Sequence, residues 1–273
     1  MKTSRSARTP RFFHDGELHA HTELQLSKKA SHHLVTVMRT KEQDRIELFN
    51  GDGYNYAATV TSSGQRTPGK RAQLTIEERN KANTESPLSL ILVQAISRGD
   101  RMDTCLRQSV ELGVTHIQPV YSHHSAKPLD EQRIEKKRTH WNNIIISACE
   151  QSGRATVPIL GTPVGLIHWL ENAASERDTI SLDPSTQRID YILSPHADNT
   201  LAAHLSTQTR LLSSCALVIG PESGFDADEI NCAISTGVQS VQFGNRILRT
   251  ETAGPACIAV MQSMLGDLRQ LRL

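Results

Sequence analysis

The chain has 273 residues, 37% of them hydrophobic and 22% charged, with a formal net charge of +1. This balance is typical of a folded globular protein of one large or two ordinary domains, and it excludes a disordered or fibrous chain. No apolar run approaches the ~20 residues of a membrane-spanning helix, and no apolar segment follows the basic N-terminus, so we expect a cytoplasmic protein without a signal peptide.

The first 82 residues are expected to form a small β-rich domain. Alternating apolar residues flank Asn50-Gly51-Asp52-Gly53, a strong hairpin-turn signal, and the alternation returns at Leu74 and Ile76. One helix interrupts this pattern, with Leu34 on its apolar face and Ser31 as its expected N-cap. Residues 80–87 (NKANTESP) are polar and end in proline, which indicates a linker to a second domain, residues 83–273.

After Pro87 the pattern changes to strands alternating with helices. The strands are expected at residues 88–95, 116–121, 179–182, 216–219 and 238–243. Helical spacing begins at Met102 and ends at Gly113, a candidate C-cap, and a longer helix covers residues 134–148. This order predicts an α/β domain with a parallel sheet covered on both faces.

A glycine-bearing loop, residues 220–225 (GPESGF), joins the strand that ends at Ile219 to a helix. Asp226 and Glu229 have the spacing of a capping box, which predicts that the helix begins directly after the loop. Loops of this kind bind ligands at the edge of α/β sheets, although a purely structural turn is equally compatible. A triphosphate-binding loop is excluded because no Gly-Lys-Ser/Thr follows.

A second polar segment, residues 243–252 (FGNRILRTET), precedes the last helix. Arginine and carboxylate side chains together suit the orientation of a polar substrate and proton transfer. The last helix carries an apolar stripe typical of core or of a dimer interface, with Pro255 expected in its first turn.

Other polar groups carry less information. Arg5, Arg8 and Arg11, and later Arg66, Lys70 and Arg71, form basic clusters that suit phosphate groups or ordinary solvated surface. The paired histidines at 32–33 and 123–124 lack cysteine or carboxylate neighbours at zinc spacing, so we expect no metal.

Several sequence motifs, taken in their order along the chain, resemble those of the bacterial 16S rRNA uridine-N3 methyltransferases of the SPOUT superfamily. The segments are RFF at 11–13, SRGDRMD at 97–103, SVELGV at 109–114, ACEQSGR at 148–154, IGPE at 219–222 and RILRTET at 246–252. The family pattern usually has glycine where Ser223 stands and often proline where Asn245 stands.

The resemblance implies a PUA-like β-barrel, a catalytic domain with a C-terminal trefoil knot, S-adenosyl-L-methionine (SAM) as cofactor, and a homodimer with its site at the interface. It implies SAM-binding loops at residues 182–184, 219–224 and 243–250. The cofactor-binding residues expected from it are Leu182, Asp183, Ile219, Gly220, Pro221, Glu222, Gly224, Phe243, Gly244, Ile247, Leu248 and Thr250. The expected RNA-binding residues are Arg11, Arg98, Arg154 and Arg246.

The expected reaction is methyl transfer to N3 of a uridine in 16S rRNA of the small ribosomal subunit. Uridine N3 carries a proton at neutral pH, so Glu251 is a candidate base and Arg249 a candidate for stabilising the uracil anion. Glu251 is equally suited to anchor Arg246 across the loop. Two alternatives stay open: methylation of a ribose 2′-hydroxyl or another base, and a non-catalytic rRNA-binding assembly factor.

Overall fold

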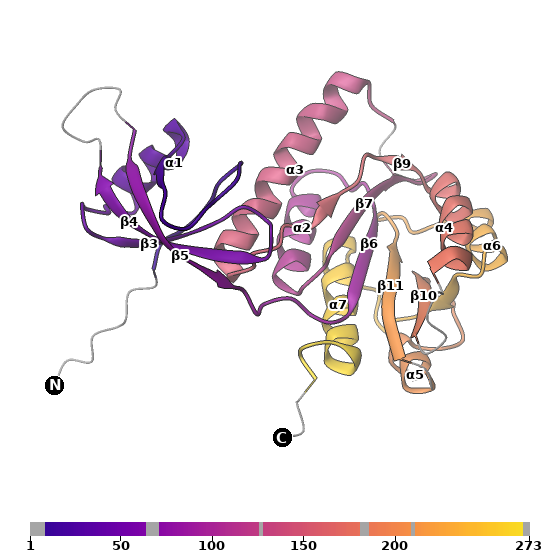
Figure 1. Ribbon diagram of the computed structural model, residues 1–273. Coiled ribbons are helices and arrows are strands. Elements are labelled where there is room, and N and C mark those ends of the chain that lie inside the picture. The colour runs from indigo at the N-terminus through magenta and orange to yellow at the C-terminus, as the bar shows by residue number, and fades with distance from the viewer. Residues whose placement is uncertain (1–8, 64–70, 126–127, 181–185, 209–210, 270–273) are drawn as a thin grey trace. The chain divides into compact units, whose positions relative to one another are not determined.

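The computed structural model describes residues 9–63, 71–125, 128–180, 186–208 and 211–269 (Figure 1). It divides into two compact units. The first comprises Met1–Thr84 with Cys149–Val157, and the second comprises Glu85–Ala148 with Pro158–Leu273. Whether residues 1–82 and 83–273 fold as separate domains stays a prediction.

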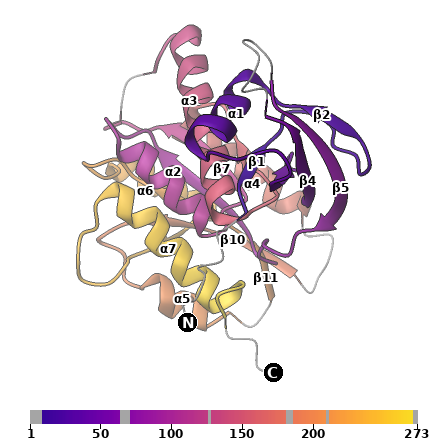
Figure 2. The ribbon, with the colours of Figure 1, turned by 90° about the vertical axis from the view of Figure 1, so that its left-hand side faces the viewer.

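The first unit is built on a five-stranded sheet with the order β1-β3-β4-β5-β2. Its strands are β1 (Arg11–Phe13), β2 (Glu23–Gln25), β3 (Arg45–Phe49), β4 (Tyr54–Ser62) and β5 (Gln73–Lys81). β1 pairs with β3 in parallel and the other neighbours are antiparallel, and β4 and β5 form the long hairpin visible in Figure 2. The alternating residues Tyr56, Ala58 and Val60 are buried in the core, as the sequence pattern predicts.

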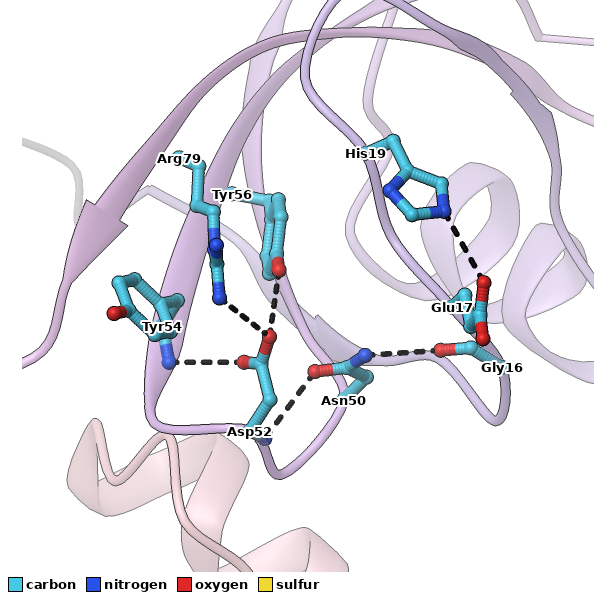
Figure 3. Close-up of polar contacts among 8 residues, drawn as sticks. All are labelled: Gly16, Glu17, His19, Asn50, Asp52, Tyr54, Tyr56 and Arg79. Atoms are coloured by element: carbon cyan, nitrogen blue, oxygen red, sulfur yellow. Dashed lines mark hydrogen bonds and ion pairs between the residues drawn. The ribbon is translucent and has the colours of Figure 1, made fainter.

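The turn at Asn50–Gly53 joins β3 to β4, which confirms the predicted hairpin (Figure 3). Gly51 and Gly53 have φ values of 95° and 85°, a region that glycine enters without strain. The Asp52 carboxylate accepts hydrogen bonds from the Tyr54 amide (3.0 Å) and the Tyr56 hydroxyl (2.6 Å), which fixes the start of β4 (Figure 3). The Arg79 guanidinium of β5 lies 3.6 Å from the Tyr54 ring centroid.

The predicted N-cap of the first helix was wrong. Helix α1 (Lys28–His32) begins one turn earlier than expected, and Ser27 is its N-cap, accepting from the Ala30 amide. Ser31 is instead buried, and its hydroxyl accepts from the Ala72 amide. The π-helix η1 (His33–Val37) follows directly. The residues that flank a serine in the sequence do not show whether it is buried or caps a helix. At Ser31 the contact with Ala72, 41 residues away, makes the difference.

The second unit contains a seven-stranded sheet with the order β12-β10-β11-β6-β7-β8, with β9 paired to β7. Its strands are β6 (Ser89–Ala95), β7 (His116–Tyr121), β8 (Ile159–Leu160), β9 (Val164–Gly165), β10 (Thr186–Leu193), β11 (Leu211–Ile219) and β12 (Gln239–Val241). Every pairing in this sheet is parallel, which confirms the predicted α/β class.

Helices cover both faces of this sheet (Figure 1). They are α2 (Arg101–Glu111), α3 (Glu131–Ser152), α4 (Leu166–Ile180), α5 (Leu201–Ser206), α6 (Ala227–Ser235) and α7 (Thr250–Leu265). α2 and α7 pack together on one side, where α7 contacts β6 and β11, while α4 and α6 lie on the other. Leu112 is the C-cap residue of α2, and Gly113 follows it. Gly113 has φ 88°, the left-handed conformation expected of a glycine at a helix end, which confirms the predicted end of this helix. None of the helices in the described ranges is long and apolar enough to cross a membrane.

Two predicted positions in this unit were wrong. Thr179 and Ile180, expected to begin a strand, end helix α4, and the neighbouring strand is β10, residues 186–193. The short run Thr179–Leu182 is compatible with either structure because periodicity does not separate a short apolar strand from a helix end. Pro255 lies in the second turn of α7, not the first, because the helix begins at Thr250.

Candidate functional site

A pocket of about 800 Å³ lies at the carboxyl ends of β10, β11 and β12. Three loops form most of its wall, residues 193–196, 219–224 and 242–249. Arg101 of α2 and Thr250, Glu251 and Ala253 of α7 complete the lining. The pocket therefore forms where consecutive parallel strands end, which is the usual ligand-binding edge of an α/β sheet.

Most residues expected to hold the cofactor line this one pocket. They are Ile219, Gly220, Pro221, Glu222, Gly224, Phe243, Gly244, Ile247, Leu248 and Thr250. Leu182 and Asp183, expected in the third loop, lie outside the described residues. The described loop after β10 is instead Leu193-Ser194-Pro195-His196, which sequence reasoning missed.

The missed loop had a detectable signal. Leu193-Ser194-Pro195 repeats the Leu-x-Pro pattern of Leu182-Asp183-Pro184 a short distance along the chain. The later copy directly follows a strand of the sheet, since β10 ends at Leu193. Placement of the strand, not the Leu-x-Pro pattern, selects the loop.

The loop after β11 is held tightly at its two ends. A Cβ added to Gly220 would lie 3.3 Å from the Phe225 ring, tighter than most real contacts. Gly224 has φ 75°, whereas Ser223 is not among the residues with positive φ. Serine at 223, where the resemblance leads us to expect glycine, therefore introduces no backbone strain. The predicted capping box of Asp226 and Glu229 is present and starts α6 directly after the loop.

A buried polar chain fixes this loop to α7. The Thr250 hydroxyl donates to the Gly220 carbonyl at 2.7 Å and accepts from Gln94 Nε2 at 3.0 Å. Gln94, at the end of β6, is 1% exposed, and its Oε1 accepts from the Cys105 thiol at 3.3 Å. Burial raises the pKa of the Cys105 thiol to about 12, so this thiol stays a protonated donor. The loop after β11, β6, α2 and α7 are thus connected by buried hydrogen bonds.

Glu222 in the same loop forms an ion pair with Arg101 on the first turn of α2. Its Oε1 accepts from Arg101 Nη1 at 2.5 Å and from the Arg98 amide at 3.4 Å. Desolvation raises the pKa of Glu222, but hydrogen bonds from its own amide, from Arg101 and from the Arg98 amide outweigh that effect and hold it below the ordinary value. Glu222 is therefore a charged link between the pocket loop and α2.

Arg249 and Glu251, the two candidate catalytic residues, lie at the start of α7. Arg249 is the N-cap residue with extended backbone, exposed, and makes no side-chain cap hydrogen bond. Glu251 follows in the first turn, and its Oε2 is buried without a hydrogen-bond partner among the described residues. The predicted alternative contact of Glu251 with Arg246 is not among the ion pairs of the described residues.

The four arginines expected to bind RNA fall into two groups. Arg98 and Arg246 are exposed and lie at the pocket or its margin. The side chain of Arg11, in the first unit, is 7% exposed and donates to Glu47, Asn55 and the Cys149 carbonyl. Desolvation lowers the pKa of Arg11 despite the Glu47 contact. Arg154 in the same unit is 3% exposed. The buried pair therefore has the geometry of structural residues.

Of the histidines at 123–124, His123 contacts Asp226, the N-cap residue of α6. His123 Nδ1 lies 2.8 Å from Asp226 Oδ2. Across the described part of the chain, no group of three or more histidine, cysteine or carboxylate side chains is arranged to hold a metal ion.

A parallel sheet with a pocket enclosed by the loops of three adjacent strands is typical of α/β proteins that bind a nucleotide-like ligand at that edge. The family model described as "RNA methyltransferase domain" matches residues 84–262, and the one described as "RNA methyltransferase PUA domain" matches residues 26–67. Both units of the chain are therefore matched in part by domains of RNA methyltransferases.

Comparison with individual proteins shows the family of RNA methyltransferases to which the chain is similar. Ribosomal RNA small subunit methyltransferase E of Buchnera aphidicola (subsp. Schizaphis graminum) is 31% identical over 261 residues, covering 96% of this chain and 98% of the relative. A Neisseria gonorrhoeae protein of the same name, solved with S-adenosyl methionine, is 35% identical with a TM-score of 0.80, covering 95% and 99%. A Legionella pneumophila methyltransferase solved with bound SAM is 33% identical with a TM-score of 0.82, covering 96% and 100%. The chain belongs to the ribosomal RNA small subunit methyltransferase E family.

Proposed function

We propose that this protein transfers the methyl group of SAM to N3 of a uridine in 16S rRNA of the small ribosomal subunit. Family membership over nearly the whole chain supports the coarser activity, SAM-dependent methylation of small-subunit rRNA. The observation that carries the finer proposal is the presence of a cation, Arg249, and a carboxylate, Glu251, together in the lining of the pocket.

The pocket residues fit SAM. The volume of about 800 Å³ lies within the ~300–1,000 Å³ of ligand pockets. At Gly224 and Gly244 an added Cβ would meet no atom within 4 Å, so the backbone there borders open space that a ligand can approach. When bound, SAM supplies an electrophilic methyl group on a sulfonium sulfur.

The residues of this chain then have two tasks, positioning and removal of a proton. In-line transfer of a methyl group depends mainly on holding the two reacting atoms in line. The Glu251 carboxylate accepts the uridine N3 proton, and the exposed Arg249 guanidinium stabilises the negative charge left on the uracil ring. Glu251 is suited to this task because it lines the pocket together with Arg249.

RNA contact and self-association complete the proposal. Arg98 and Arg246 are exposed near the pocket and are proposed to contact phosphate groups of the substrate. Ile247 is 86% exposed in the pocket loop, and an apolar side chain at that position suits burial by a second copy of the chain in a homodimer. A trefoil knot around the cofactor stays a prediction from the family resemblance.

The test is incubation with methyl-labelled SAM and small subunits from cells that lack this modification, followed by nucleoside analysis. We expect one labelled 3-methyluridine per subunit. Label in a 2′-O-methylated nucleoside or in another base would exclude the N3 assignment. SAM binding measured by calorimetry without any transfer would instead favour the non-catalytic assembly factor.

A further inference from the structure

Two neutral polar residues in the lining of the pocket that fits SAM are Ser223 and Asn245. Ser223 lies in the loop after β11, and Asn245 lies in the loop after β12. Both residues are exposed, and neither side chain takes part in a hydrogen bond or an ion pair with another residue of the described ranges. The wall of the pocket therefore carries a hydroxyl and a carboxamide whose hydrogen-bonding capacity is available to a ligand.

The backbone of both loops accepts a side chain at these two positions. In each loop the left-handed conformation falls on a neighbouring glycine, Gly224 with φ 75° and Gly244 with φ 68°. Ser223 and Asn245 are not among the residues with positive φ, so a side chain there causes no backbone strain. For the same reason, either residue can be replaced by alanine without a change in the conformation of its loop.

Each of the two polar residues adjoins backbone that borders open space. A Cβ added to Gly224 or to Gly244 would meet no atom within 4 Å, so a ligand can approach the backbone closely at both glycines. Consecutive Cα atoms are only about 3.8 Å apart. A ligand beside either glycine is therefore also close to the polar residue next to it in the chain.

The same two positions distinguish this chain from the pattern of the proteins that it resembles. That pattern usually has glycine at 223 and often proline at 245, and neither residue has a hydrogen-bonding group in its side chain. Serine and asparagine each carry a side chain that both donates and accepts hydrogen bonds. Both differences lie in the lining of one pocket, so they change the chemistry of the surface that faces the cofactor.

The charges of the pocket indicate which part of SAM these two side chains suit. SAM has a charged end, with an ammonium and a carboxylate group, and a neutral nucleoside whose ribose carries hydroxyl groups. The pocket lining contains charged side chains that suit the charged end, those of Arg101, Glu222, Arg246, Arg249 and Glu251. A neutral hydroxyl and a neutral carboxamide suit the ribose instead, because each ribose hydroxyl also both donates and accepts.

We propose that Ser223 and Asn245 bind the ribose hydroxyls of SAM and are specificity-determining residues of the cofactor site in this chain. The inference rests on SAM as the cofactor and not on which atom of the rRNA is methylated, so failure of the N3 assignment would leave it standing. A net hydrogen bond between neutral groups changes an affinity by roughly two- to tenfold. Each of the two residues should contribute a factor of that size to the affinity for SAM.

The first experiment measures the Kd of SAM by calorimetry for Ser223→Ala, Asn245→Ala and Ser223→Thr, which keeps the hydroxyl. The matched controls are Ser235→Ala and Asn231→Ala, at exposed positions of α6 outside the pocket lining. Ser223→Ala and Asn245→Ala should each weaken binding roughly two- to tenfold, whereas Ser223→Thr and both controls should match the wild type. Unchanged SAM affinity in either pocket variant would overturn the assignment of that residue. An equal loss in the controls, or a wild-type protein that binds no SAM, would overturn the whole inference.

A second experiment tests which part of the cofactor is bound. Methylthioadenosine has the nucleoside of SAM without the amino-acid end, and its affinity should fall in Ser223→Ala and Asn245→Ala by the same factors as that of SAM. Competition by adenine, which has no ribose, should be the same for the wild type and both variants. A loss confined to SAM would place the contacts at the amino-acid end, and a loss with adenine would place them at the base. Either result would overturn the ribose assignment, and neither depends on methyl transfer.

Discussion

The hydroxyl of Thr250 donates a hydrogen bond to the carbonyl of Gly220 at 2.7 Å, which joins the first residue of α7 to the first residue of the cofactor loop. The same hydroxyl accepts from buried Gln94. One side chain therefore fixes two parts of the pocket that are 30 residues apart.

Replacing this hydroxyl should destabilise the protein and weaken cofactor binding together. Thr250→Val keeps the shape but leaves the Gly220 carbonyl and a buried Gln94 N–H unpaired, so we expect a loss of about 1–3 kcal/mol in the free energy of unfolding. Thr250→Ser retains the hydroxyl and is the control. Denaturant unfolding and SAM calorimetry measure both effects, and equal stability of the two variants would contradict the role of this contact.

A larger side chain at position 220 should abolish SAM binding without unfolding the protein. A Cβ added there would lie 3.3 Å from the Phe225 ring and 3.4 Å from the Gly224 backbone, so Gly220→Val must displace the loop. Gly165→Val is the matched control, because a Cβ at Gly165 meets nothing within 4 Å and its φ is not in the left-handed region. Unchanged SAM affinity in Gly220→Val, measured by calorimetry, would remove this loop from the cofactor site.

Substitution of the two candidate catalytic residues should lower the rate of methyl transfer without weakening cofactor binding. Arg249→Ala and Glu251→Gln are expected to lower the single-turnover rate about a hundredfold, typical of general acid–base residues, and to leave the Kd of SAM nearly unchanged. Both side chains are proposed to act on the uracil ring and not on the cofactor. If SAM affinity and rate fall in parallel, the two residues have structural roles.

The buried cysteines should be unreactive in the folded protein. Burial raises the pKa values of Cys105, Cys215 and Cys257 to about 12, so at pH 8 these thiols carry their proton and lack the reactive thiolate. Alkylation followed by mass spectrometry should leave these three unmodified until denaturant is added. Rapid labelling of Cys105 in the native protein would show that the chain beneath the pocket opens.

Phosphate contact by the first unit should appear in the salt dependence of RNA binding. Arg71 is the exposed, described member of its basic cluster, and Arg71→Ala should reduce the slope of log affinity against log salt by roughly one. SAM affinity should not respond. A point variant is preferable to removal of residues 1–84, because residues 149–157 pack with the first unit and Arg11 donates to the Cys149 carbonyl. An unchanged slope would show that Arg71 contacts no phosphate.

The sequence by itself determined the features that depend on neighbouring residues. The Asn50–Gly53 turn, the capping box of Asp226 and Glu229, and strand β7 all follow from local geometry and were predicted correctly. The parallel sheet was also predictable, because alternating strand and helix patterns leave few other arrangements. Local ambiguity explains the errors at Ser31 and at Thr179 and Ile180.

Only the tertiary structure decided which polar residues meet. Arg101 and Glu222 are 121 residues apart, and Gln94 and Thr250 are 156 apart. The periodicity of a sequence does not show which residues so far apart along the chain come into contact. Parallel strands are joined by crossovers, and these bring distant loops to one edge of the sheet. The same reason explains why Leu193–His196 reached the pocket unpredicted, and why Arg11, with an ordinary surface pattern, proved to be buried against Glu47 and Asn55.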